Sequence, residues 1–188
     1  MLLAEALTIA QDVVDTLTPA CRTIEIAGSV RRQKAVVGDI EIVALPLFAA
    51  SIDLFGAEEQ YSALEDRIGK LLKCSDLTLD KMLRRNGPLY KRFTRGSVSV
   101  DLFVAQQGNY GNILALRTGD AAFSRALVTE RRYGGLMPSY LKQRDGFLWY
   151  GGERLNCPDE LTYFTYMDMG WIDPPERTWP LRNGAYHE

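Results

Sequence analysis

Residues 28–42 read GSVRRQKAVVGDIEI and hold the densest pattern of functional side chains in the sequence. The preceding segment, 23–27, alternates in polarity and is expected to form a strand that ends at Gly28-Ser29. Glycine lets a phosphate group come close to the backbone. If a helix begins there, its free N–H groups and the Ser29 hydroxyl can bind phosphate oxygens. The pair Arg31-Arg32 follows and can add bidentate guanidinium contacts.

Two acidic residues lie at the start of the next strand, which is expected over residues 40–45. Asp39 and Glu41 are two positions apart, so their carboxylates project from the same face of a strand. Ile40 and Ile42 point to the opposite face, toward a core. Two clustered carboxylates beside a phosphate site repel each other unless a cation lies between them. Because Mg²⁺ prefers carboxylate and phosphate oxygens, the pattern indicates a magnesium site.

A third acid, Asp101, lies within the apolar segment 98–104, which is expected to be a strand. Its side chain either faces solvent on a half-buried strand or reaches the face that carries Asp39 and Glu41. The sequence leaves both alternatives open. In the second case three carboxylates can hold two metal ions, an arrangement suited to in-line phosphoryl or nucleotidyl transfer.

The whole pattern, Gly-Ser-x-Arg-Arg followed by Gly-Asp-x-Glu and a later third acid, resembles the signature of the DNA polymerase beta superfamily, family X in particular. Thr118-Gly119 followed by Phe123 is similar to the family's Thr-Gly turn. Residues 171–177, WIDPPER, are similar to the aromatic, proline-rich end of many members. The resemblance reaches from the first helix to about Trp179. It implies a minimal form with a palm and a nucleotide-binding lobe, without a lyase domain or helix-hairpin-helix elements.

The resemblance implies a set of nucleotide-binding residues: Gly28, Ser29, Arg32, Thr118 and Gly119. Ser29 and Arg32 would contact the β- and γ-phosphates of a nucleoside triphosphate. Thr118 and Gly119 would shape the pocket for the sugar.

The resemblance also implies that Asp39, Glu41 and Asp101 are the catalytic residues and the metal ligands. Asp39 and Glu41 would bridge two Mg²⁺ ions, for which Mn²⁺ can substitute. Asp101 would bind the ion that activates the attacking hydroxyl. Arg31 is either a further phosphate contact or a structural residue.

The sequence departs from the polymerases of the family at several positions. Glu41 stands where they usually have Asp, and Glu occurs there in superfamily branches that act on small molecules. Leu116 and Arg117 stand where polymerases commonly have aromatic residues that exclude a ribose 2′-hydroxyl. Ser124 stands where an asparagine that contacts the base is common. These departures leave the choice of sugar and acceptor open.

Composition excludes several other classes of protein. The chain has 188 residues, one histidine (His187) and three cysteines without a CxxC spacing, so histidine catalysis, a disulfide framework and a zinc site are not expected. No apolar run approaches the ~20 residues of a membrane span, so no membrane partner is expected. The first segment carries acids and is predicted to be an amphipathic helix, not a signal peptide. We expect a cytoplasmic location, in a host cell if the source is viral.

The net charge of −2 is unusual for a protein that binds nucleic acid, but the charges are unevenly distributed. Residues 61–100 contain nine Lys and Arg against four Asp and Glu, a net charge of +5. Lys91, Arg92 and Arg95 lie near the hairpin that leads to Asp101, where a primer strand would pass. They are the predicted DNA-binding residues. The alternative is a solvated charged face.

Hydrophobic periodicity predicts the fold class as α/β (α+β), with a polymerase beta-like palm implied by the resemblance. The palm, residues 1–105, would have a mixed sheet flanked by helices. A small C-terminal α+β lobe would follow over residues 106–188. The expected helices are 4–17, 58–73 and 120–131. The expected strands are 23–27, 40–45, 77–83, 90–94, 98–104 and a pair within 141–150.

The predicted activity is that of a metal-dependent nucleotidyltransferase of the DNA polymerase beta-like, family X type. It would add a nucleoside monophosphate from a nucleoside triphosphate to the 3′-hydroxyl of a DNA primer or gapped duplex and release pyrophosphate, as in DNA repair. We expect a monomer. One alternative is the same chemistry on RNA, a small molecule or a protein hydroxyl. Another is an inactive nucleic-acid-binding module.

Overall fold

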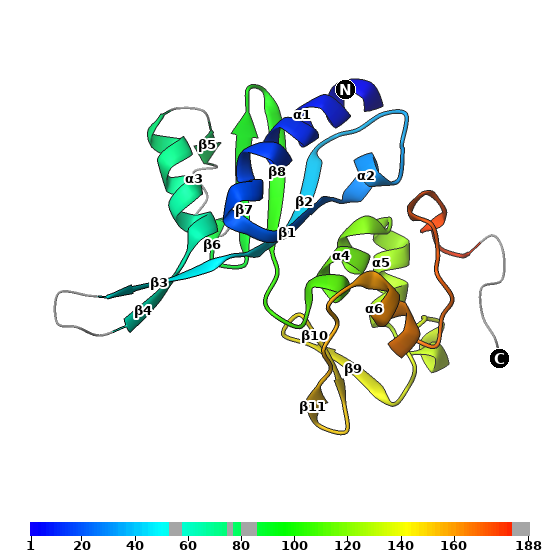
Figure 1. Ribbon diagram of the computed structural model, residues 1–188. Helices are drawn as coiled ribbons and strands as arrows, with labels where there is room; N and C mark the ends of the chain where they lie inside the picture. Colours follow the sequence, from blue (N-terminus) through cyan, green and yellow to red (C-terminus); the bar gives the residue numbers. More distant parts are fainter. Residues whose placement is uncertain (53–57, 75–76, 80–85, 182–188) are drawn as a thin grey trace.

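The structure of the chain, a computed structural model, describes residues 1–52, 58–74, 77–79 and 86–181 (Figure 1). The helices are α1 (Leu3–Leu17), α2 (Gly28–Arg31), α3 (Ala63–Lys73), α4 (Tyr110–Thr118), α5 (Ala121–Val128) and α6 (Glu160–Tyr166). Single 3-10 turns are η1 (Thr18–Ala20), η3 (Arg131–Tyr133) and η4 (Pro174–Glu176). The strands are β1 (Cys21–Ile26), β2 (Ile40–Pro46), β3 (Phe48–Ile52), β4 (Glu58–Ser62), β5 (Thr78–Leu79), β6 (Asn86–Gly87), β7 (Tyr90–Arg95), β8 (Val98–Val104), β9 (Leu141–Arg144), β10 (Phe147–Tyr150) and β11 (Glu153–Arg154). The chain is therefore a mixed α and β protein.

The main sheet is mixed and has the strand order β1-β2-β8-β7-β5, with β6 paired to β7. β1 and β2 are antiparallel, β2 and β8 are parallel, and β8 and β7 form an antiparallel hairpin. Figure 1 shows this sheet with α1 and α3 packed beside it, and the β3–β4 hairpin projecting away from it.

Alternation along β2 decides what each face of the main sheet carries. Ile40 and Ile42 are fully buried in a core that also contains the apolar sides of α1 and α3. Val43, which points to the other face, belongs to a small cluster with residues of α4. Because side chains alternate along a strand, Glu41 lies on the α4 side. This face is the one turned toward the second part of the chain.

The second part contains α4, α5, α6 and the three-stranded sheet β11-β10-β9. It has its own hydrophobic core, in which Phe123, Leu148 and Phe164 are fully buried. Figure 1 shows it below the main sheet, with α4 nearest to that sheet. Buried residues of β2 and α4 pack together between the two parts, so the expected boundary near residue 105 stays a prediction.

Several sequence expectations differ from the structure. The helix expected over 58–73 begins only at Ala63, because Ser62 caps it by accepting a hydrogen bond from the Glu65 N–H at 3.3 Å. The residues before it form β4. Of the strand expected over 77–83, Thr78–Leu79 is β5 and residues 80–83 lie outside the described residues.

Two helices of the second part, α4 and α6, were not predicted. In α4, Tyr110, Asn112 and Thr118 are buried together with Leu114 and Ala115, whereas Arg117 is exposed. Because buried positions, polar ones included, lie around most of this short helix, its sequence lacks the clear amphipathic period on which prediction depends. The segment 106–112, expected to be a loop, therefore contains the beginning of α4.

Gly111 of α4 approaches the turn before α6 so closely that a side chain there would collide with backbone. A Cβ at Gly111 would lie 1.9 Å from the carbonyl oxygen of Asp159. We expect Gly111→Ala to lower the free energy of unfolding by about 1–3 kcal/mol, measured by denaturant titration.

Gly69→Ala, in α3, is the matched control because a Cβ there meets nothing within 4 Å. It removes a helix-weakening glycine and should raise the free energy of unfolding by up to about 1 kcal/mol. Equal stability of Gly111→Ala and the wild type would contradict the close approach of α4 to Asp159.

Candidate active site

The three predicted carboxylates come together on the face of the sheet that is turned toward α4. Asp39 directly precedes β2, and Glu41 lies within it. In the parallel pair of β2 and β8, Glu41 is the register partner of Asp101. Partners in register share a face, so the alternative of a solvent-facing Asp101 does not apply: this residue is only 6% exposed.

Gly28 makes room for Glu41. Its backbone has φ of +59°, in the left-handed region that favours glycine, and a Cβ there would lie 1.9 Å from Oε2 of Glu41. The N–H of Ala27 donates to the Glu41 carbonyl at 2.8 Å. The Gly-Ser turn therefore lies directly against the carboxylate on β2.

The electrostatics of the cluster appear most clearly at Glu41. The pKa of its carboxyl group is raised to about 7, first by burial and second by the neighbouring charge of Asp39. Arg117 and Arg32 act in the opposite direction. Near neutral pH the group is therefore close to its titration midpoint, and a nearby cation would favour its charged form.

Arg92 lies between the acids. In the β7–β8 hairpin it is directly opposite Asp101, and its guanidinium donates to both Asp101 oxygens. The same group contacts Asp39 at 3.4 Å. The Tyr90 hydroxyl donates to Asp101 at 2.7 Å. The hydrogen bond to Asp101 raises the pKa of Arg92, so this side chain supplies a permanent positive charge within the cluster.

Within the described ranges, no three acidic, histidine or cysteine side chains converge closely enough to enclose a metal ion. The guanidinium of Arg92 contacts both Asp39 and Asp101 and so lies where a metal ion would bridge them. A metal-binding arrangement therefore requires Arg92 to move away from at least one carboxylate.

The predicted nucleotide-binding residues are partly brought together. Arg32 donates to the carbonyl oxygens of Thr118 at 2.7 Å and Gly119 at 2.9 Å. Burial lowers the pKa of Arg32, while Glu41 and Asp120 raise it. Its Nε is buried without a hydrogen-bond partner, so one donor of this guanidinium remains unused.

Arg31 joins the two parts of the chain and has a structural environment. It donates to the Thr118 hydroxyl at 2.9 Å and to Glu160 of α6 at 2.7 Å. Glu160 also accepts a hydrogen bond from Arg177, a side chain with no solvent exposure. Sequence reasoning missed Glu160. It gave no distinct signal, because acids at the beginning of a helix are common on the surface of proteins.

A cavity of about 530 Å³ opens beside the carboxylates. Its lining residues are Glu41, Leu89, Tyr90, Asp101, Phe103, Val104, Asn109, Ile113, Arg117, Asp145 and Gly146. One wall is aromatic: Tyr90 and Phe103 stack at 5.2 Å between ring centroids, and the Arg117 guanidinium lies 4.0 Å over the Phe103 ring. The cavity thus offers apolar surface, a cation and three acids to a ligand.

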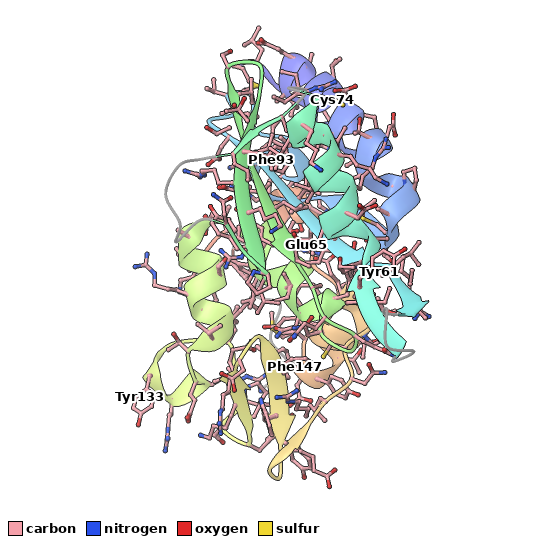
Figure 2. All side chains as sticks on the ribbon, turned by 90° about the vertical axis from the view of Figure 1, so that its left-hand side faces the viewer. Tyr61, Glu65, Cys74, Phe93, Tyr133 and Phe147 are labelled. Carbon is pink, nitrogen blue, oxygen red and sulfur yellow. The ribbon has the colours of Figure 1, made fainter. Side chains whose placement is uncertain are left out.

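The structure does not bring the three predicted DNA-binding residues into one strip. Lys91 and Arg92 are consecutive on β7 and point to opposite faces. Lys91 is 8% exposed and pairs with Glu65 of α3 at 2.8 Å (Glu65 is labelled in Figure 2). Arg95 pairs with Asp12 of α1 at 2.9 Å. Alternation along β7 separates Lys91 from Arg92, and acids of the chain already pair with these cations, so their binding of DNA stays a prediction.

No family model matches the chain, and no curated protein matches it. In the part of the chain that the structure describes, no helix combines the length and apolar character that a membrane span requires.

Replacement of Arg92 tests its role as an internal cation. Arg92→Gln leaves the buried Asp101 carboxylate without its charged partner, so the metal-free variant should lose about 1–3 kcal/mol of stability. The same change increases the negative charge of the cluster. We expect its affinity for Mn²⁺, measured by calorimetric titration, to rise about tenfold. Arg95→Gln, on the same strand but paired with Asp12, should leave Mn²⁺ affinity unchanged.

Glu41 predicts a pH dependence of stability in the absence of metal. Its pKa is about 7 in the folded chain against an ordinary 4.5. The folded state therefore holds this proton more tightly, and the resulting stability is fully present below pH 4.5 and is lost as the pH rises through about 7.

Glu41→Gln removes this titration. In EDTA, the melting temperature of the variant minus that of the wild type should increase between pH 4.5 and about 7 and then level off. The change corresponds to a free energy on the order of 2 kcal/mol. A difference that does not vary with pH would contradict the raised pKa.

Proposed function

We propose that the chain is a metal-dependent nucleotidyltransferase with a polymerase beta-like fold. The observation that carries the proposal is the placement of Asp39, Glu41 and Asp101 on one face of the sheet, beside a cavity and against the Gly28-Ser29 turn. The reaction forms a bond from an acceptor hydroxyl oxygen to the α-phosphorus of a nucleoside triphosphate. It breaks the bond from that phosphorus to the β-phosphate, and pyrophosphate leaves.

The residues of the cluster fit a divalent metal. All three ligands would be carboxylate oxygens, which Mg²⁺ and Mn²⁺ prefer. The cluster already holds one positive group, Arg92, and the pKa of Glu41 is raised by burial and then by the charge of Asp39. Asp39, Glu41 and Asp101 would hold the ions. When bound, these ions neutralise charge on the phosphates and lower the pKa of the attacking hydroxyl.

The Gly28-Ser29 turn and Arg32 would bind the triphosphate. Among the described residues, the Ser29 hydroxyl forms no hydrogen bond with the protein. The Arg32 Nε likewise has no partner. Both groups are close in sequence to the turn that packs on Glu41, so a phosphate bound there would lie next to the carboxylates.

The acceptor would enter through the cavity lined by Asp101, Tyr90 and Phe103. The resemblance favours the 3′-hydroxyl of a DNA primer or gapped duplex as the acceptor. A second candidate is a small molecule, an RNA or a protein hydroxyl. The internal pairing of Lys91 and Arg95 favours this candidate, because it removes the cations expected to hold a DNA backbone beside the site.

The test is transfer of a labelled nucleotide to a DNA primer, a gapped duplex, an RNA or a small hydroxyl compound, with Mg²⁺ or Mn²⁺. Asp101→Asn keeps the shape of the side chain but removes a metal ligand, so the rate should fall about a hundredfold or more. Asp66→Asn on α3, where Asp66 pairs with the exposed Lys70, is the matched control and should keep full activity.

Transfer by the wild type to a DNA end identifies the polymerase-like function, and transfer only to another acceptor identifies the second candidate. Metal-dependent transfer that survives in Asp101→Asn would show that this residue is not a ligand. Binding of DNA without transfer to any acceptor would instead identify an inactive binding module.

A further inference from the structure

The outer face of the small sheet carries cations and aromatic rings that the candidate active site does not use. Residues directly opposite each other on neighbouring strands share a face of a sheet. On this face Phe147 is paired with Arg144, and Trp149 is paired with Lys142 and Arg154. These five residues are called the β9–β11 face below. Figure 2 labels Phe147, which lies on β10 in the second part of the chain.

The aromatic rings of the β9–β11 face lie against guanidinium groups. The guanidinium carbons of Arg144 and Arg154 are 5.6 Å and 5.2 Å from the centre of the Trp149 ring. Arg154 also lies 4.6 Å from the centre of the Phe147 ring. The Trp149 indole N–H donates to the Arg144 carbonyl at 3.1 Å, which fixes the orientation of the ring. The result is an ordered surface of alternating flat cations and rings.

The charge of this face is only partly compensated. The Lys142 and Arg144 side chains are 63% and 73% exposed. Lys142 shares its acidic partner, Glu130, with Arg132, and Arg144 pairs with Asp145. Within the described residues, Arg154 forms no ion pair. The cations therefore outnumber the acids, and the surface attracts polyanions.

The β9–β11 face is continuous with the cavity of the candidate active site. Asp145 and Gly146, which form the turn between β9 and β10, line that cavity together with Glu41 and Asp101. The Gly146 carbonyl accepts a hydrogen bond from Asn112 of α4 at 2.6 Å, which anchors the turn. A ligand strand that leaves the cavity over this turn would reach Arg144 first and Trp149 next.

We propose that the β9–β11 face binds a single-stranded segment of nucleic acid. Its bases stack on Trp149 and the flanking guanidinium groups, and its phosphates contact Lys142, Arg144 and Arg154. Trp149 is half-buried and Phe147 is buried behind Arg154, so Trp149 is the ring that a base can reach. Aromatic rings within a positive surface are the features that bind single strands without sequence preference. An acidic peptide would satisfy the cations but not the ring. Only the route of the strand from the cavity rests on the proposed function. Binding on this face does not require catalysis.

The first test measures binding of a fluorescein-labelled oligothymidine by anisotropy, in EDTA and without nucleotide, over a series of salt concentrations. The double change Arg144→Gln and Arg154→Gln should weaken binding about tenfold. It should reduce the slope of log affinity against log salt by about 1.4, since each lost phosphate contact on a single strand accounts for ~0.7.

The matched control is Arg22→Gln with Lys34→Gln, which removes two exposed cations from the first part of the chain. It should leave the affinity within about twofold of the wild type. Equal losses in both double variants would overturn the proposal, because binding would then depend on overall charge. Absence of measurable binding by the wild type would overturn it as well.

Tryptophan fluorescence tests the stacking. Oligothymidine and oligouridine should both quench the emission of the wild type, and Trp149→Phe should lose this quenching while Trp171→Phe keeps it. Trp171 is 46% exposed but lies away from this sheet, so it is the matched control. Quenching that persists in Trp149→Phe would show that bases do not stack there.

Competition decides the class of ligand. A fully paired duplex, polyglutamate and an unlabelled single strand are each tested as competitors of oligothymidine. If the duplex or polyglutamate competes as strongly as the single strand, the assignment to single strands is overturned. Asp101→Asn separates this inference from the proposed function. The variant should bind oligothymidine as the wild type does even if no acceptor is ever found, and loss of oligothymidine binding in this variant would contradict a separate face.

Discussion

The parallel pairing of β2 with β8 imposes the constraint on which the site depends. It sets Glu41 beside Asp101, with Asp39 one position before the strand, on the face that the second part of the chain covers. Such clustered acids repel each other, and burial increases the repulsion because it removes water. The surroundings therefore have to supply positive charge. Arg92 supplies it at Asp101, and Arg32 and Arg117 partly supply it at Glu41.

The Arg31-Arg32 pair, which follows the turn beside Glu41, joins the two parts of the chain. Arg31 and Arg32 leave the turn that packs on Glu41, and both reach the end of α4 at Thr118. Arg31 continues to Glu160 on α6. One short segment thus contacts the carboxylate strand and two helices of the second part. A shift of that part relative to the sheet would change the environment of Glu41 directly.

The sequence was informative where chemistry and periodicity agreed. The alternation of β2 predicted that Glu41 points away from the core that holds Ile40 and Ile42, whereas the sequence left the face of Asp101 open. The role of Arg92 was missed although its signal was present: the two-residue loop Gly96-Ser97 fixes the hairpin register and sets Arg92 opposite Asp101. Contacts of Arg32 with the carbonyls at the end of α4 could not be predicted, because this helix, buried around most of its surface, lacks a clear amphipathic period.

Two arginine–carboxylate contacts in this chain have similar chemistry but different surroundings. Arg177 is fully buried, contacts Glu160 and the Ile172 carbonyl, and lies 5.0 Å from the ring centres of Phe164 and Trp171. Exchange of that arginine would leave buried Glu160 with Arg31 as its remaining charged partner, and no lining residue of the cavity takes part, so the contact is structural. Arg92 is 24% exposed and its partner Asp101 lines the cavity. Solvent reaches this second pair, so under the proposed function a bound cation would replace Arg92 at the carboxylates while the guanidinium turns toward water or phosphate.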